Sequence, residues 1–188
     1  MKKTIALAVA VQAFGSGPES LLYRSIRGDL GAAYSTSAVL TQLTPGVGLF
    51  VTTLQLDAEK APAAIARLKA EYDGFMARGI DESQVKTVTE APKKAELDRP
   101  PLSRAVNLLQ YEVRNLSIER VRELIKLFDQ IRAERINELI REILPKGLLT
   151  VVLAPASVSL PADCTIKELA ESAKCKLEKQ TSEAKRSD

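Results

Sequence analysis

A glycine-broken stretch near the N-terminus, Phe14–Leu43, constrains the fold of this chain most strongly. Gly15–Pro18 interrupts the chain after an apolar run, because glycine and proline are strong breakers of regular structure. Glu19–Ile26 then has the spacing of a short helix, and Ala33–Thr41 alternates small or polar residues with apolar ones. Val47–Leu56 alternates in the same way after a Pro-Gly turn, so the two alternating segments predict an antiparallel hairpin.

A block of helices follows the hairpin. Asp57 is placed to cap the first helix of this block, and Gly79 is placed to end it. Asp81 and Gln84 have the three-residue spacing of a capping box, which predicts that a second helix begins there. Pro92 is expected to kink or interrupt that second helix, because proline lacks the N–H that helix hydrogen bonding requires.

A wholly apolar run, Leu148–Ala154, is expected to form a short buried strand after the helices. The order of one helix, two strands, many helices and one strand predicts an α+β domain, with helices packed on one face of an antiparallel sheet. The first apolar helix has no strand before it, and three strands make a small sheet for so many helices. The pattern therefore suggests a domain without its opening strands.

The sequence contains no histidine among its 188 residues. This excludes histidine-based acid–base chemistry, Ser-His and Cys-His nucleophile pairs, and any zinc site that needs imidazole. The net charge of +3 is spread along the chain and gives no footprint for nucleic acid. No apolar run is long enough to span a bilayer. The chain by itself therefore has no recognisable catalytic machinery, and no metal or cofactor site is predicted in it.

The N-terminal segment Met1–Ala13 has two interpretations. Two lysines, a short apolar run and a Val-Gln-Ala ending are typical of a secretory signal peptide. The same residues include strong helix formers and continue directly into Phe14 without a polar spacer, which is typical of a buried helix. The residues alone leave both interpretations open.

Cys164 and Cys175 are the only cysteines, and they lie eleven positions apart across a predicted short helix. They are either two unrelated thiols or a disulfide. A disulfide would indicate an oxidising compartment, such as the periplasm or the extracellular space. A cytoplasmic location follows instead if Met1–Ala13 is a structural helix and the cysteines are free. Residues 1–155 are assigned to the main domain, and residues 156–188 to an extension with the cysteine pair and a charged tail.

The central stretch resembles the non-catalytic, C-terminal type of domain in the insulinase, or pitrilysin, family of zinc peptidases, which includes the mitochondrial processing peptidases. Arg27 and Tyr34 lie seven positions apart with Gly31 between them, inside a longer pattern of matching residues. The zinc motif H-x-x-E-H of the catalytic domains is absent. The matching segments are Ile5–Phe14, Gly15–Gly17, Ser20–Arg27, Gly31–Ala38, Gly46–Leu56, the helix opening near Ala61-Pro62, Gly79–Glu82 and Leu148–Pro155.

The resemblance implies a role in proteolysis that depends on a second, homologous domain. In the family, one domain holds zinc, and its non-catalytic counterpart lends an arginine and a tyrosine to the peptide substrate. Arg27 and Tyr34 match those positions, so they are the candidate substrate-binding residues, with zinc expected only in the partner domain. A phenol can donate a hydrogen bond to the carbonyl oxygen under attack, and a guanidinium can hold a nearby carbonyl.

Other readings stay open beside this one. Judged from spacing alone, Arg27 is a solvated cation at a helix end, and Tyr34 packs at the edge of the core. The chain would then be a catalytically inert scaffold or binding module with the same fold, or a truncated remnant of it. Peptide cleavage that depends on Arg27 and Tyr34 would distinguish the non-catalytic peptidase half from an inert scaffold. A broad, non-cooperative melt of the isolated chain would indicate a remnant.

Overall fold

The computed structural model describes residues 2–44, 47–98, 100–113, 126–155 and 157–175. The chain divides into two compact units, Met1–Val152 and Leu153–Asp188. The assignment of residues 1–155 and 156–188 to separate domains stays a prediction. The charged tail, and Pro45 and Gly46 of the predicted turn, lie outside the described residues.

The described residues of the first unit form helices and one β-hairpin. Its elements, in chain order, are α1 (Lys2–Gly15), the π-helix η1 (Tyr23–Asp29), β1 (Ala33–Thr44), β2 (Val47–Leu56), the 3-10 turn η2 (Ala58–Lys60), α2 (Ala61–Arg78), α3 (Glu82–Leu97), α4 (Pro101–Val113) and α6 (Ala133–Ile143).

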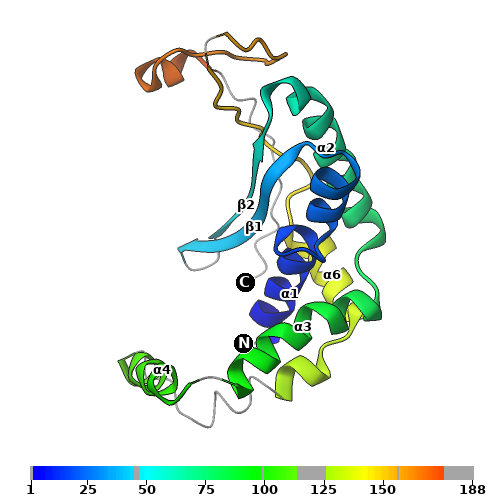
Figure 1. Cartoon of the computed structure of the whole chain (residues 1–188), viewed down its shortest axis with the longest axis vertical. Helices are drawn as coiled ribbons and strands as arrows, with labels where there is room; N and C mark the ends of the chain where they lie inside the picture. Colours follow the sequence, from blue (N-terminus) through cyan, green and yellow to red (C-terminus); the bar gives the residue numbers. More distant parts are fainter. Residues whose placement is uncertain (1, 45–46, 99, 114–125, 156, 176–188) are drawn as a thin grey trace, which may run out of the picture. The chain divides into compact units, whose positions relative to one another are not determined.

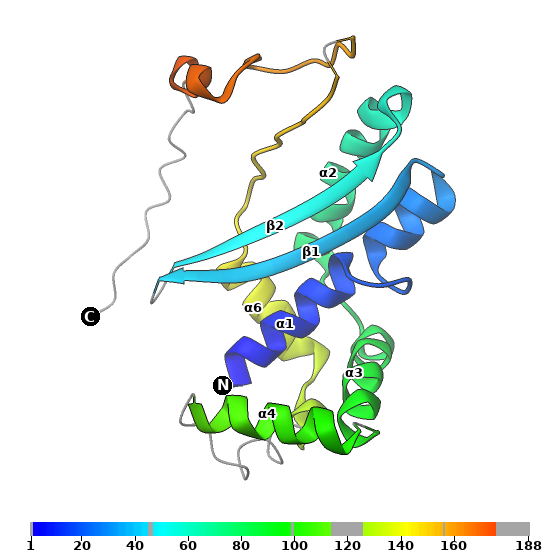
Figure 2. The same ribbon diagram turned by 60° about the vertical axis from the view of Figure 1, so that its left-hand side comes forward.

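The hairpin is the sheet of this unit. β1 and β2 pair antiparallel, from Ala33 opposite Leu56 to Thr44 opposite Val47. α1, α2 and α6 lie on one side of the two strands (Figure 1), and the C-terminal end of α1 reaches β1, against which α1 packs (Figure 2). The predicted α+β class, with helices on one face of an antiparallel sheet, is confirmed.

The core lies between the hairpin and these helices, and Phe14 is at its centre. Its side chain is fully buried, and its ring centroid lies 4.8 Å from that of Phe75, 5.7 Å from Tyr72 and 5.9 Å from Phe50. α1 meets β1 closely beside it, because a Cβ on Gly15 would lie 2.5 Å from the Cβ of Ala38. α1 is thus a core helix in the structure, which favours the second interpretation of the N-terminal segment.

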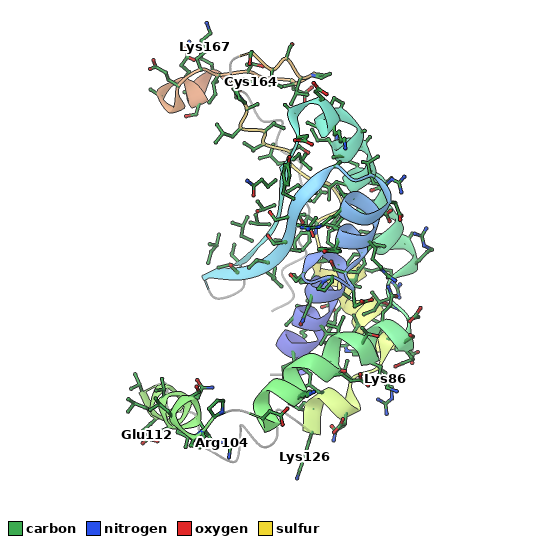
Figure 3. All side chains as sticks on the ribbon, viewed as in Figure 1. Lys86, Arg104, Glu112, Lys126, Cys164 and Lys167 are labelled. Atoms are coloured by element: carbon green, nitrogen blue, oxygen red, sulfur yellow. A yellow bond between two sulfur atoms is a disulfide. The ribbon has the colours of Figure 1, made fainter. Side chains whose placement is uncertain are left out.

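The face of the hairpin that points away from the helices is open, and its side chains project outward (Figure 3). At the base of the hairpin, the end away from the turn where Ala33 pairs with Leu56, this face is polar, with Ser35 and Ser37 exposed. Toward the turn it is apolar, with five exposed side chains: Val39, Leu43, Val47, Leu49 and Val51. The alternating residue pattern that predicted two strands therefore arises because the helices cover one face of the hairpin and leave the other exposed.

The prediction of a buried strand at Leu148–Ala154 is wrong. This run forms no strand and no backbone–backbone hydrogen bond with other described residues. Its side chains are largely exposed, reaching 82% at Val151 and 100% at Leu153. Apolar composition predicts burial, but a strand also needs a neighbouring backbone to pair with, and the described residues offer none to this run.

The helix boundaries follow local signals, with one correction. Asp81 and Gln84 form the predicted capping box at the start of α3, with reciprocal hydrogen bonds of 2.8 and 2.9 Å. Gly79, with a φ of 70°, ends the preceding helix as predicted. Of the two outcomes expected at Pro92, an interruption is wrong, because α3 continues to Leu97, whereas a kink stays a prediction. One proline removes one hydrogen bond, which a helix of this length tolerates when its other turns remain intact.

Tyr72 gives the core a pH-dependent element. Its hydroxyl donates a 2.6 Å hydrogen bond to the carbonyl of Pro145, and burial, with a smaller effect from Asp73, raises the pKa of its phenol to about 12. In the unfolded chain this phenol ionises near pH 10, about two units earlier. The stability from the neutral, buried Tyr72 is therefore complete below pH 10 and is lost between about pH 10 and 12.

We expect the stability advantage of the wild-type chain over Tyr72→Phe to shrink across that interval, because the variant has no phenol to ionise. Urea unfolding of both chains at a series of pH values measures this difference. The other tyrosines and the lysines titrate in both chains and cancel in the comparison. A constant difference from pH 8 to pH 12 would contradict the assignment.

Candidate functional site

The structure brings Arg27 and Tyr34 together at the base of the hairpin. Arg27 lies in the last turn of η1, a π-helix that begins at Tyr23 rather than the ordinary helix predicted over Glu19–Ile26. Single-turn π-helices are often found at functional sites. Gly31, with a φ of 57°, turns the chain from η1 into β1, a conformation that glycine adopts without strain.

Tyr34 is the extra residue of a β-bulge. Ala33 pairs with Leu56 and Ser35 pairs with Gln55, so two steps along β1 match one step along β2. A bulge leaves one residue outside the regular ladder and redirects its side chain. Tyr34 is accordingly 60% exposed, on the open side of the sheet. The expectation that it packs at the edge of the core does not hold.

Arg27 stabilises this bulge from the side. Its guanidinium donates a hydrogen bond to the backbone carbonyl of Tyr34, an oxygen that the irregular ladder leaves available. Its Cζ also lies 5.1 Å from the ring centroid of Tyr23, one helical turn earlier, within the range of a cation–π contact. Arg27 is therefore a held side chain rather than a freely solvated cation.

Asp57 belongs to the same site, although the sequence pattern indicated only a helix cap there. Its carboxylate makes no capping hydrogen bond to the helix that follows. Its Oδ1 instead accepts a 2.8 Å hydrogen bond from the Tyr34 hydroxyl. This hydrogen bond and the negative charge of Asp57 raise the pKa of the Tyr34 phenol, because ionisation would lose the bond and place two anions together.

Lys60 completes the set of polar groups around the turn. Its ammonium donates a 2.8 Å hydrogen bond to the carbonyl of Gly31, between Arg27 and Tyr34 in sequence. Asp57, Lys60 and Tyr23 were all missed from the sequence. The signal for Asp57 was the hairpin itself: Asp57 directly follows β2, and pairing Ala33 with Leu56 places it opposite Ala32, two residues before Tyr34.

The residues present do not fit a zinc ion. No group of three or more His, Cys, Asp or Glu side chains that could hold a metal occurs in the described part of the chain. The chain also has no histidine. The Arg27–Tyr34 site can donate and accept hydrogen bonds and can bind negative charge, but a metal would have to come from elsewhere. Among the described helices, none combines the length and hydrophobicity needed to cross a membrane.

In the second unit Cys164 and Cys175 are placed as a disulfide pair, with their Cα atoms 5.5 Å apart. The short 3-10 helix η3 (Leu169–Lys174) lies between them, and Glu171 pairs with Lys174 within it. The Glu171 pKa is lowered by these contacts, first by the hydrogen bond from Lys174. The geometry agrees with a disulfide, whose formation in the protein stays a prediction.

We expect no free thiol in the denatured, unreduced chain and two after reduction, measured with a thiol reagent. Replacing both cysteines by alanine should then lower the free energy of unfolding of this unit by roughly 2–3 kcal/mol, because the closed loop is short. Two free thiols in the unreduced chain would contradict the pairing.

Residues 2–91 match the family described as "Peptidase M16 inactive domain". Residues 2–91 belong to the peptidase M16 inactive-domain family. The matched segment runs from α1 into α3 and contains Arg27, Tyr34, Asp57 and Lys60. The resemblance to a non-catalytic domain of this peptidase family is thereby confirmed. No curated protein matches the chain.

Solved structures support the fold of this M16 inactive domain. The chain is similar to a peptidase M16 inactive domain from Pseudomonas fluorescens, with a TM-score of 0.65 and 14% identity over 76% of this chain and 34% of that one. It is similar to a protease from Helicobacter pylori, with a TM-score of 0.63 and 15% identity over 76% and 34% of the two chains.

A third similar structure is described as a putative zinc protease from Bordetella pertussis. Its TM-score is 0.56 and its identity 11%, over 76% of this chain and 78% of that one. At these identities the likeness concerns the fold alone. The chain spans about a third of the length of the Pseudomonas and Helicobacter structures.

Proposed function

We propose that this M16 inactive domain is the non-catalytic half of a pitrilysin-type zinc metallopeptidase. It would bind the peptide substrate and support its transition state, while a separate H-x-x-E-H domain supplies the zinc. The observation that carries the proposal is the exposed phenol of Tyr34, held beside Arg27 on a β-bulge inside the family-matched segment. The partner is a homologous zinc-bearing domain or subunit, and the substrate is a peptide.

The two side chains have different roles in this proposal. Hydrolysis of a peptide bond places negative charge on the carbonyl oxygen, and a positioned phenol O–H stabilises that charge. Tyr34 suits this role, because its side chain is exposed while its backbone is held in place. β2 pairs with the residues on either side of it, and Arg27 of η1 donates to its carbonyl. Arg27 adds positive charge beside Tyr34 and holds the carbonyl of the bulge, so its donors that are not used there can bind a substrate carbonyl.

The direct test is complementation. The chain is mixed with a candidate H-x-x-E-H domain, first one encoded beside it, and cleavage of a fluorogenic peptide library is measured for each component and for the mixture. We expect cleavage only in the mixture, with a rate that saturates as the chain is added. A stable complex that cleaves no faster than the zinc-bearing component alone would refute the proposal.

A catalytically inert scaffold of the same fold is the second candidate. One observation favours it: the Tyr34 hydroxyl and the Arg27 guanidinium already have partners within the chain. A scaffold needs these groups only for its own fold. In that case the complex would form, and its activity would be indifferent to conservative changes at both residues.

A further inference from the structure

The Asp57 side chain interacts with Tyr34 rather than with the helix that it precedes. As the residue before η2 it could cap the helix through its side chain, which is the common use of aspartate at such positions. The structure shows no such cap. Its backbone N–H donates to the carbonyl of Ala32, and its Oδ1 accepts from the Tyr34 hydroxyl. Asp57 therefore joins the end of β2 to the start of β1.

The hydrogen bond decides where the phenol points. A tyrosine side chain can rotate about two bonds, and Tyr34 is too exposed for packing to fix its orientation. A charge-assisted hydrogen bond to a carboxylate is stronger than a neutral one and favours one rotamer. The phenol has a single proton, which in the structure faces Asp57. A substrate oxygen would have to compete with Asp57 for that proton.

We propose that Asp57 is a positioning residue for Tyr34. Its carboxylate orients the phenol at the bulge, and the phenol O–H, which keeps its proton, then donates its hydrogen bond to a carbonyl oxygen that gains negative charge instead of to Asp57. The effect of Asp57 on catalysis rests on the proposed function, whereas the hydrogen bond between Tyr34 and Asp57 does not depend on it. The other charged side chains at the site, Arg27 and Lys60, donate to backbone carbonyls rather than to the phenol oxygen.

The first test uses the chain without a partner. Ionisation of its tyrosines is followed by ultraviolet absorbance, and the Tyr34 titration is obtained as the difference between wild type and Tyr34→Phe. We expect Asp57→Asn to move this titration to lower pH, because the raised pKa of Tyr34 comes from Asp57. Glu59→Gln is the matched control, since it removes an exposed negative charge two residues away and should leave the titration in place. An unchanged titration in Asp57→Asn would overturn the proposal.

The second test measures peptide cleavage by the complex with the zinc-bearing partner. We expect Asp57→Asn to lower kcat on the order of 10-fold with little change in KM, as is typical when an orienting partner is lost. The same change in a Tyr34→Phe background should have no further effect, because Asp57 acts through the phenol. Asp57→Glu should restore part of the rate.

The outcomes separate the two proposals. A shifted titration with no cleavage by any wild-type complex would refute the proposed function and leave the Asp57–Tyr34 link intact. Cleavage that rises in Asp57→Asn, or that falls equally in both backgrounds, would overturn the positioning role while leaving the proposed function standing.

Discussion

Tyr34→Phe should lower partner-dependent peptide cleavage by about 100- to 1000-fold, the usual cost of removing one hydrogen-bond donor to a developing oxyanion. The change removes one hydroxyl and keeps the ring. Because Arg27 contacts the Tyr34 carbonyl rather than its side chain, the bulge should be preserved. The loss should therefore appear in kcat. Steady-state kinetics of the complex, together with a binding measurement between the two components, checks this.

Arg27 requires a conservative substitution, because its side chain makes two contacts within the chain. Arg27→Ala would free the carbonyl of the bulge and remove the contact with Tyr23, so a lost activity would have two causes. Arg27→Lys keeps the charge and loses the planar donor set, which separates charge from geometry. Ser37→Ala, on the same open face of β1, is the neutral control. Full activity of Tyr34→Phe in an intact complex would leave the inert scaffold as the better account.

Phe14→Ala should lower the free energy of unfolding of the first unit by about 3–5 kcal/mol. Phe14 is fully buried and contacts three other aromatic rings, from β2 and α2. Its loss removes apolar contact area and leaves a cavity that rigid neighbours fill only in part. Small domains have a total stability of roughly 5–15 kcal/mol, so the variant should be close to unfolding. Urea denaturation followed by circular dichroism measures the change.

Two comparisons make this result specific. Phe14→Leu keeps most of the volume and should cost less, whereas Leu102→Ala on α4 removes a side chain that is 78% exposed and should change stability by less than about 0.5 kcal/mol. Equal effects of Phe14→Ala and Leu102→Ala would contradict the described core. A broad, non-cooperative melt of the wild-type chain would instead support the remnant of a larger fold.

Local patterns predicted most of the secondary structure. The hairpin, the capping box at Asp81 and the helix end at Gly79 rest on side chain and backbone geometry within a few residues. Leu148–Ala154 failed because pairing of a strand depends on a distant partner. The interruption expected at Pro92 did not occur, because the other hydrogen bonds of α3 carry the helix past one missing bond. The localisation and the presence of zinc in a partner stay predictions.

The sequence by itself determined the α+β class through its periodicity, and the resemblance of its motifs to a known family pointed to Arg27 and Tyr34. Only the tertiary structure decided how the two side chains are held. The bulge that turns Tyr34 outward depends on the register between β1 and β2, and the hydrogen bond from Tyr34 to Asp57 joins residues 23 positions apart. Such contacts arise from chain folding in three dimensions, and no pattern within a short window contains them.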